Sequence, residues 1–100
     1  MDLEYFKENI CEELEGSKDY IIRAIEIKPM QATWSKMLVE MSAQELMHAT
    51  NLNNMFNEYC KILTDSYPEM PDYVRKIRDE VAEMYATKSA QIKMMHESYK

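Results

Sequence analysis

Hydrophobic residues recur every three or four positions along three stretches of this 100-residue chain, and short proline-containing segments separate the stretches. Such spacing places the apolar side chains on one face of an α-helix. The pattern predicts helices over about residues 2–28, 31–64 and 72–98. We therefore expect an all-α fold, in a single domain of residues 1–100, in which a third helix follows an antiparallel helical hairpin.

Prolines mark both predicted connections. Pro29 ends the first helix, because the residue before a proline is disfavoured in the helical conformation. Pro68 and Pro71 lie in the second connection, and Pro71 suits the start of the third helix.

The apolar face of the second predicted helix is interrupted by two ionisable residues. Its positions are Trp34, Leu38, Met41, Glu45, His48, Leu52, Met55, Tyr59 and Leu63. Glu45 and His48 thus lie one turn apart on the face that we expect to point to the core. Because an unpaired buried charge costs several kcal/mol, a partner must compensate it, and we interpret that partner as a metal ion.

The first predicted helix carries a matching carboxylate. Its apolar face is Leu3, Phe6, Ile10, Glu13, Ser17, Tyr20, Ala24 and Ile27. Glu13 lies 16 residues before Pro29 and Glu45 lies 16 residues after it. At 1.5 Å per residue each is about 24 Å from the turn, so we expect the two carboxylates to be level, with His48 one turn further along.

A Glu-x-x-His motif facing a glutamate on a neighbouring helix is the ligand pattern of di-iron and di-manganese carboxylate bundles. Carboxylates can bridge two ions, and imidazole adds a nitrogen ligand while leaving coordination positions open for oxygen or peroxide. A complete site has about four carboxylates and two histidines, of which one hairpin supplies half. We therefore expect a homodimer, or a higher homo-oligomer, in which two hairpins form a four-helix bundle.

Composition excludes several other classes. A net charge of −6 argues against a nucleic-acid backbone or an anionic membrane as partner. We find neither a secretion signal nor an apolar run long enough to span a membrane. Two widely separated cysteines, Cys11 and Cys60, do not suggest a disulfide framework, so a cytoplasmic location is expected. We expect no role for His96, near the end of the chain.

The motif Glu-Glu-Leu-Glu at residues 12–15, followed by Tyr20 and then by Glu45-x-x-His48, resembles the ferritin-like superfamily. Within it, the chain is most similar to the encapsulated ferritins, short chains that form the di-iron site on dimerisation. The resemblance covers about residues 5–60. It implies ferroxidase activity, in which two Fe(II) ions are oxidised by oxygen or peroxide for iron storage or detoxification.

The resemblance also implies roles for individual residues. The iron ligands would be Glu13, Glu45 and His48. Tyr20 would pack beside the catalytic site, and Glu12 and Glu15 would match a secondary site where metal ions enter. An encapsulin shell would be a partner, but the family's targeting peptide is not seen before Lys100, so residence in a shell stays open.

Two other functional classes stay open. One is a metal-free helical interaction module, in which the polar residues on the apolar face fix the register of the partner. The other is a ferritin-like oxidase or peroxidase that does not store iron. The native metal is also open, since manganese and zinc tolerate the same ligands as iron.

Overall fold

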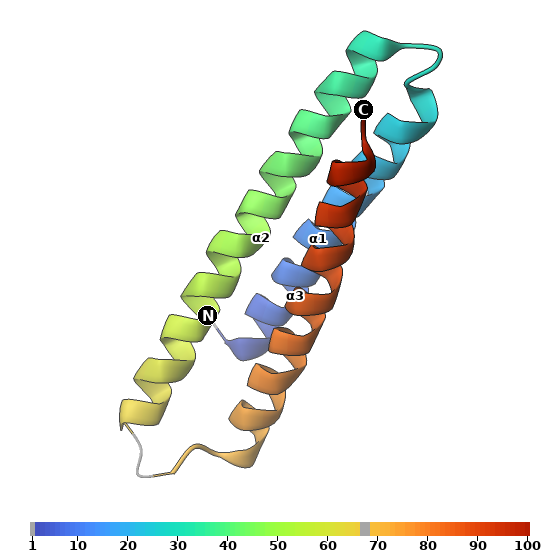
Figure 1. Ribbon diagram of the computed structural model, residues 1–100. Helices are drawn as coiled ribbons and strands as arrows, with labels where there is room; N and C mark the ends of the chain where they lie inside the picture. Colours follow the sequence, from blue (N-terminus) through green and yellow to red (C-terminus); the bar gives the residue numbers. More distant parts are fainter. Residues whose placement is uncertain (1, 67–68) are drawn as a thin grey trace.

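The computed structural model describes residues 2–66 and 69–100, and within these ranges it contains three α-helices and no strand. The first, α1, covers Leu3–Ile27, α2 covers Ala32–Ser66, and α3 covers Asp72–Ser98. They lie side by side in a rod of 58 × 20 × 16 Å (Figure 1). The predicted all-α class is confirmed, and every helix end lies within two residues of its predicted position.

Local signals set the helix ends. The carboxylate of Asp2 caps α1 by accepting a hydrogen bond from the backbone N–H of Tyr5 at 2.8 Å. Pro71 stands at the N-cap of α3, and Asp72 in the first turn interacts favourably with the helix dipole. Pro68, expected in the second connection, lies outside the described residues.

Small polar side chains join α1 and α2 in an antiparallel pair. The Ser17 hydroxyl donates to the Ser42 carbonyl at 2.8 Å, and the Ser42 hydroxyl donates to the Ser17 carbonyl at 2.7 Å. Nearer the turn, the Ser35 hydroxyl donates to the Ala24 carbonyl at 2.6 Å. Direct bonds from side chain to opposing backbone require close approach, which only small residues at the contact permit.

This close approach corrects the predicted core. The buried residues of α2 each lie one position beyond the predicted face: Ser35, Ser42, Ala49, Phe56 and Cys60. On α1, Leu14 and Ile21 are buried in place of Glu13 and Tyr20, which are only half-buried. The small side chains occupy the line of contact between the helices, so the larger side chains of the predicted α2 face remain at its edge.

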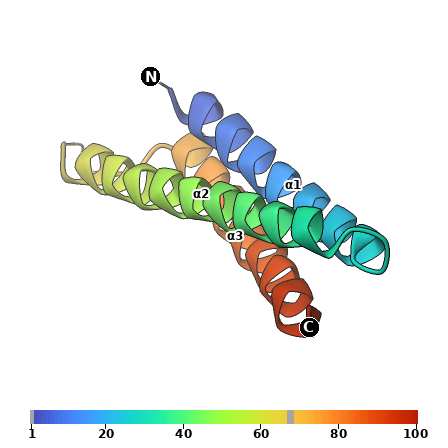
Figure 2. The same cartoon turned by 90° about the horizontal axis from the view of Figure 1, so that it is seen from above.

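The third helix runs parallel to α1 and antiparallel to α2. Seen from above, it crosses the α1–α2 pair obliquely (Figure 2). Two ion pairs connect it to α1: Lys7 Nζ lies 2.8 Å from Glu80 Oε2, and Lys88 pairs with Glu15. Because these side chains are about 35–53% exposed, the pairs orient α3 more than they stabilise it.

Hydroxyl groups of α2 hold α3 on its other side. Tyr99 and Tyr85 hydrogen-bond through their phenolic oxygens with Ser35 at 2.8 Å and with Thr50 at 2.7 Å. Between these two links, His96 Nε2 lies 2.8 Å from Ser42 Oγ. The expectation that His96 has no role is therefore wrong, since this side chain connects α3 to the contact between α1 and α2.

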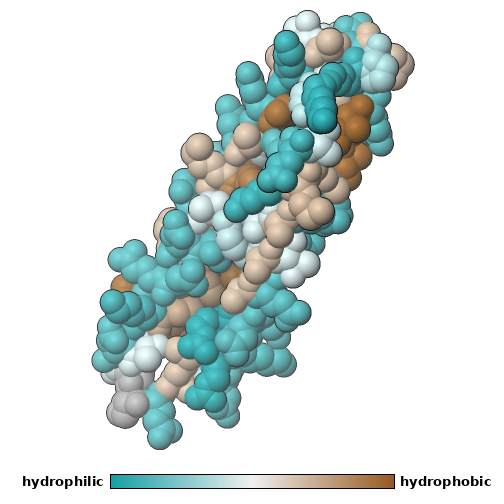
Figure 3. All heavy atoms as spheres, in the orientation of Figure 1, coloured by the Kyte–Doolittle hydropathy of each residue, from teal (hydrophilic) through white to brown (hydrophobic). Residues whose placement is uncertain are grey.

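A row of large side chains on α2 reaches the surface. We call it the exposed α2 stripe, and its members, seven residues apart, are Trp34, Met41, His48, Met55 and Ile62. The four apolar members are between 39% and 57% exposed. Hydrophobic side chains also reach the surface among hydrophilic ones on the face drawn in Figure 3. Among the described residues, no helix has the length and apolar character needed to cross a membrane.

Candidate metal centre

Glu13 of α1 meets Glu45 and His48 of α2 in one cluster. Their ligand atoms all lie within 4.8 Å of one another. His48 Nδ1 is 3.5 Å from Glu13 Oε2 and 3.7 Å from Glu45 Oε1. The predicted register is thus confirmed, because residues equidistant from the turn of an antiparallel hairpin lie level across it.

The cluster lies at the edge of the α1–α2 contact, rather than in the core as predicted. The Glu13 and Glu45 side chains are 28% and 31% exposed, and the His48 side chain is 56% exposed. Thr50, which hydrogen-bonds to Tyr85 of α3, lies about 140° around α2 from Glu45 and about 160° from His48. One chain therefore presents these three ligands on a side of the hairpin that α3 does not cover.

The negative charges of the Glu13 and Glu45 carboxylates repel each other. The adjoining Glu13 carboxyl raises the pKa of Glu45 by favouring a shared proton; partial burial and repulsion between the two charges raise it further, and His48 lowers it. Oε2 of Glu13 is buried and has no hydrogen-bond donor within the part of the chain that the structure describes. A bound cation would satisfy this oxygen and remove the repulsion.

Gly16 makes room for the Glu45 carboxylate, a role that the sequence did not reveal. It is the only glycine in the chain and lies in the middle of α1. A Cβ at this position would lie 3.1 Å from Glu45 Oε2, and the next nearest atoms also belong to Glu45. The signal was a lone glycine in a long helix, but only the fold shows what it faces.

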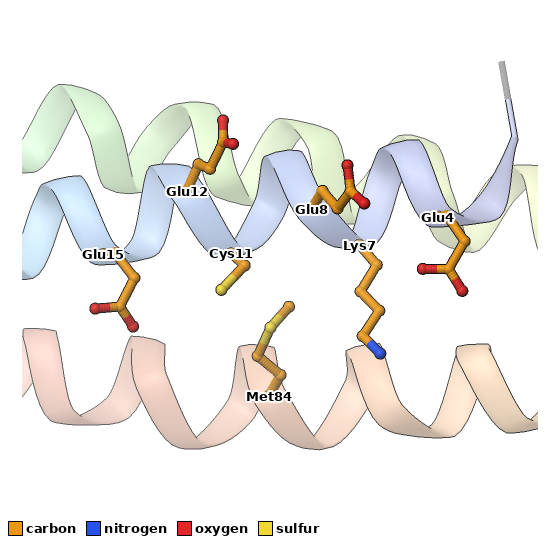
Figure 4. Close-up of a pocket in the computed structure, with 7 residues that line it drawn as sticks. All are labelled: Glu4, Lys7, Glu8, Cys11, Glu12, Glu15 and Met84. Carbon is orange, nitrogen blue, oxygen red and sulfur yellow. The ribbon is translucent and has the colours of Figure 1, made fainter.

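The other predicted site residues lie apart from the cluster. Tyr20 is half-buried two turns beyond Glu13 on α1. Glu15 points towards α3 and pairs with Lys88, which lowers the pKa of Glu15, whereas Glu12 points away from α3 (Figure 4). The structure thus does not bring Glu12 and Glu15 to the three clustered residues.

Glu12 and Glu15 instead line an open groove of about 640 Å³ along α1. The Cys11 thiol and the Met84 thioether face each other in it (Figure 4). Cys11 is half-buried and Cys60 is buried, and both are free thiols.

The donor set fits a divalent transition metal. Two carboxylates and one imidazole suit Fe(II), Mn(II) or Zn(II). They are also half of the four carboxylates and two histidines of a di-metal bundle. Among the described residues, α3 adds no ligand to this cluster: Glu80 pairs with Lys7, and His96 binds Ser42.

Comparisons of the chain with protein-family models, with curated proteins and with solved structures found no match.

Proposed function

We propose that this protein is a ferroxidase that oxidises Fe(II) at a di-iron carboxylate site shared by two subunits, for iron storage or detoxification. The observation that carries the proposal is the convergence of Glu13, Glu45 and His48 within 4.8 Å from two helices. The buried Oε2 of Glu13 supports it, because this oxygen accepts no hydrogen bond from the described residues and its contact with His48 Nδ1 is 3.5 Å long, so a cation would satisfy it.

The number of ligands supports the second subunit. One chain supplies two carboxylates and one imidazole, so two copies related by a two-fold axis would supply the complement of a di-metal bundle. The exposed α2 stripe runs through His48, which is where the second copy would have to pack. Association and metal binding would then be coupled, since neither subunit alone has a complete site.

In this proposal, iron is the substrate. Two Fe(II) ions would each give up one electron; dioxygen with two protons would leave as hydrogen peroxide, or peroxide with two protons would leave as two waters. Glu13 and Glu45 would hold the ions. The proton that the two carboxyls tend to share would be released as the metal binds. A role for Tyr20 beside the site, and for Glu12 and Glu15 where ions enter, rests on the resemblance to encapsulated ferritins.

Fe(II) binding and oxidation by the wild type, Glu45→Ala and His48→Ala test the proposal. We expect each substitution to weaken Fe(II) binding at least about tenfold and to abolish rapid oxidation, because each removes a ligand. Glu40→Ala is the matched control, since Glu40 is an exposed carboxylate on the same helix. Unchanged binding and oxidation in both ligand variants would refute the proposal.

The same proteins separate the other functional classes. A protein that associates but binds no iron, manganese or zinc would be the metal-free interaction module. Rapid oxidation without accumulation of a ferric mineral would indicate an oxidase or peroxidase that does not store iron.

A further inference from the structure

Trp34 is the only tryptophan of the chain, and it is 57% exposed in the first turn of α2. Tryptophan is enriched among the residues that dominate binding at protein interfaces, where it fills a pocket on the partner. Its exposure on a stripe of apolar side chains therefore indicates a surface where a partner with a matching pocket would bind.

An apolar groove lies at the other end of the same stripe. Its volume is about 350 Å³, and it is lined by Phe6, Met55, Glu58, Tyr59 and Ile62. Phe6 is buried and packs edge-on against Tyr59, with ring centroids 5.9 Å apart. Met55 and Ile62 are 48% and 55% exposed. The groove therefore has buried Phe6 at its base and exposed apolar side chains along its rim.

Trp34 and this groove are placed symmetrically about the metal cluster. Trp34 lies 14 residues before His48, and Ile62 lies 14 residues after it, about 21 Å in each direction. The inner members of the stripe, Met41 and Met55, are likewise seven residues on either side of His48. A two-fold axis near His48 would bring an antiparallel α2 helix of a second copy against α2 in matching register.

We propose that each Trp34 inserts into the groove formed by the partner's Phe6, the partner's Met55 and the partner's Ile62, in a dimer whose α2 helices are antiparallel. The inference rests on the two-subunit site proposed above and deepens it, because the same axis brings the two Glu13–Glu45–His48 clusters together. Trp34 then sets the register of the two half-sites.

The α1–α2 face that carries the stripe has the area of a stable dimer interface. From Trp34 to Ile62 the stripe is about 42 Å long, and two helices side by side are about 20 Å across. These dimensions give about 800 Å² on each subunit, the area that a standard-size interface buries. The stripe contains no lysine or arginine, and its only ionisable member, His48, belongs to the metal cluster.

Tryptophan fluorescence of the full chain, with metal removed by a chelator, tests the inference. We expect the emission to shift to longer wavelength on dilution, with the same midpoint as dissociation of the dimer measured by sedimentation. Trp34→Ala and Ile62→Glu should each weaken the dimer by about 30-fold or more, as interface hot spots do. Ile62→Glu should also leave Trp34 solvated at concentrations at which the wild type is a dimer.

The Ile62 variant is the decisive one. Trp34 and Ile62 are about 42 Å apart along one α2 helix, so only contact between two copies lets a change at Ile62 alter the Trp34 emission. Tyr73→Glu and Met94→Glu are matched controls, because these apolar residues of α3 are 64% and 69% exposed but lie off the stripe. Circular dichroism checks that all variants keep their helices.

A monomer at all concentrations, both with the chelator and with Zn(II), or Trp34 emission that Ile62→Glu leaves unchanged, would overturn the inference. The readout requires neither iron nor its oxidation, so its failure is distinguishable from that of the ferroxidase proposal. A chain that dimerises through Trp34 but neither binds nor oxidises iron would refute only the latter.

Discussion

Gly16 stands where alanine would make a more stable helix. Glycine inside a helix costs about 0.5–1 kcal/mol relative to alanine. No described residue has a positive φ, so Gly16 is not needed for backbone conformation. What it provides is space, because a Cβ would lie 3.1 Å from the Glu45 carboxylate oxygen Oε2. The chain thus gives up helix stability where it sets the position of a proposed ligand.

We therefore expect Gly16→Ala to separate stability from metal affinity. The metal-free variant should be more stable by up to about 1 kcal/mol in the free energy of unfolding, because alanine favours the helix more than glycine does. The added Cβ is tolerated because the flexible Glu45 carboxylate can turn aside. Zn(II) binding, measured by calorimetry, should weaken about tenfold because the carboxylate has moved. Lys18→Ala, also on α1, is the control. A less stable variant with unchanged Zn(II) affinity would instead assign Gly16 to helix packing.

At the scale of the elements, a hydrogen bond between His96 of α3 and Ser42 of α2 holds α3 to the hairpin. Ser42 donates its single hydroxyl proton to the Ser17 carbonyl, so it can only accept from His96, and Nε2 of His96 must carry a proton. Burial lowers the pKa of His96 below its ordinary value. The unfolded chain therefore takes up the second imidazole proton, the one that charges the ring, more readily than the folded chain.

This sign predicts that α3 docking weakens in acid. His96 contributes stability that is complete above its unfolded pKa, about 6.5, and is lost as the pH falls through the lower folded value. We expect His96→Gln to flatten the dependence of the unfolding free energy on pH between about 7 and 5, measured by denaturant titration. Glu97→Gln, an exposed neighbour, should retain the slope. Equal slopes in all three proteins would contradict this account.

The helices and the register of the proposed site were predictable because both depend on local rules. Proline positions and apolar periodicity set the helices, and a rise of 1.5 Å per residue places Glu13 level with Glu45. The inward face was not predictable in the same way. Trp34 and Ser35 are neighbours, and which one is buried depends on how closely α1 approaches α2. A periodic row of large apolar residues marks a surface to be covered, but does not say whether the same chain covers it.

As a whole molecule, the protein is a helical hairpin with one side covered by α3 and another side left exposed. α3 covers one side through the hydroxyl contacts of Ser35, Ser42 and Thr50. The exposed α2 stripe and the metal cluster lie outside that contact. Each chain carries a net charge of −6. In the proposed dimer, the Glu13–Glu45 pairs of the two chains would meet near the two-fold axis. Like charges there would oppose association in the metal-free protein.

Divalent cations should therefore strengthen the dimer. A ligand that binds only the associated state shifts the equilibrium towards it, so we expect Zn(II), which undergoes no oxidation, to lower the dimer Kd at least about tenfold. Sedimentation equilibrium with Zn(II) or with a chelator measures both values. In a Glu45→Gln, His48→Ala double variant the Zn(II) effect should vanish, and the metal-free dimer should be tighter than the wild type at neutral pH, because two carboxylate charges are gone from the axis. Glu97→Gln should behave as the wild type. If Zn(II) leaves the wild-type Kd unchanged, the cluster does not belong to the interface, and the two subunits do not share a metal site.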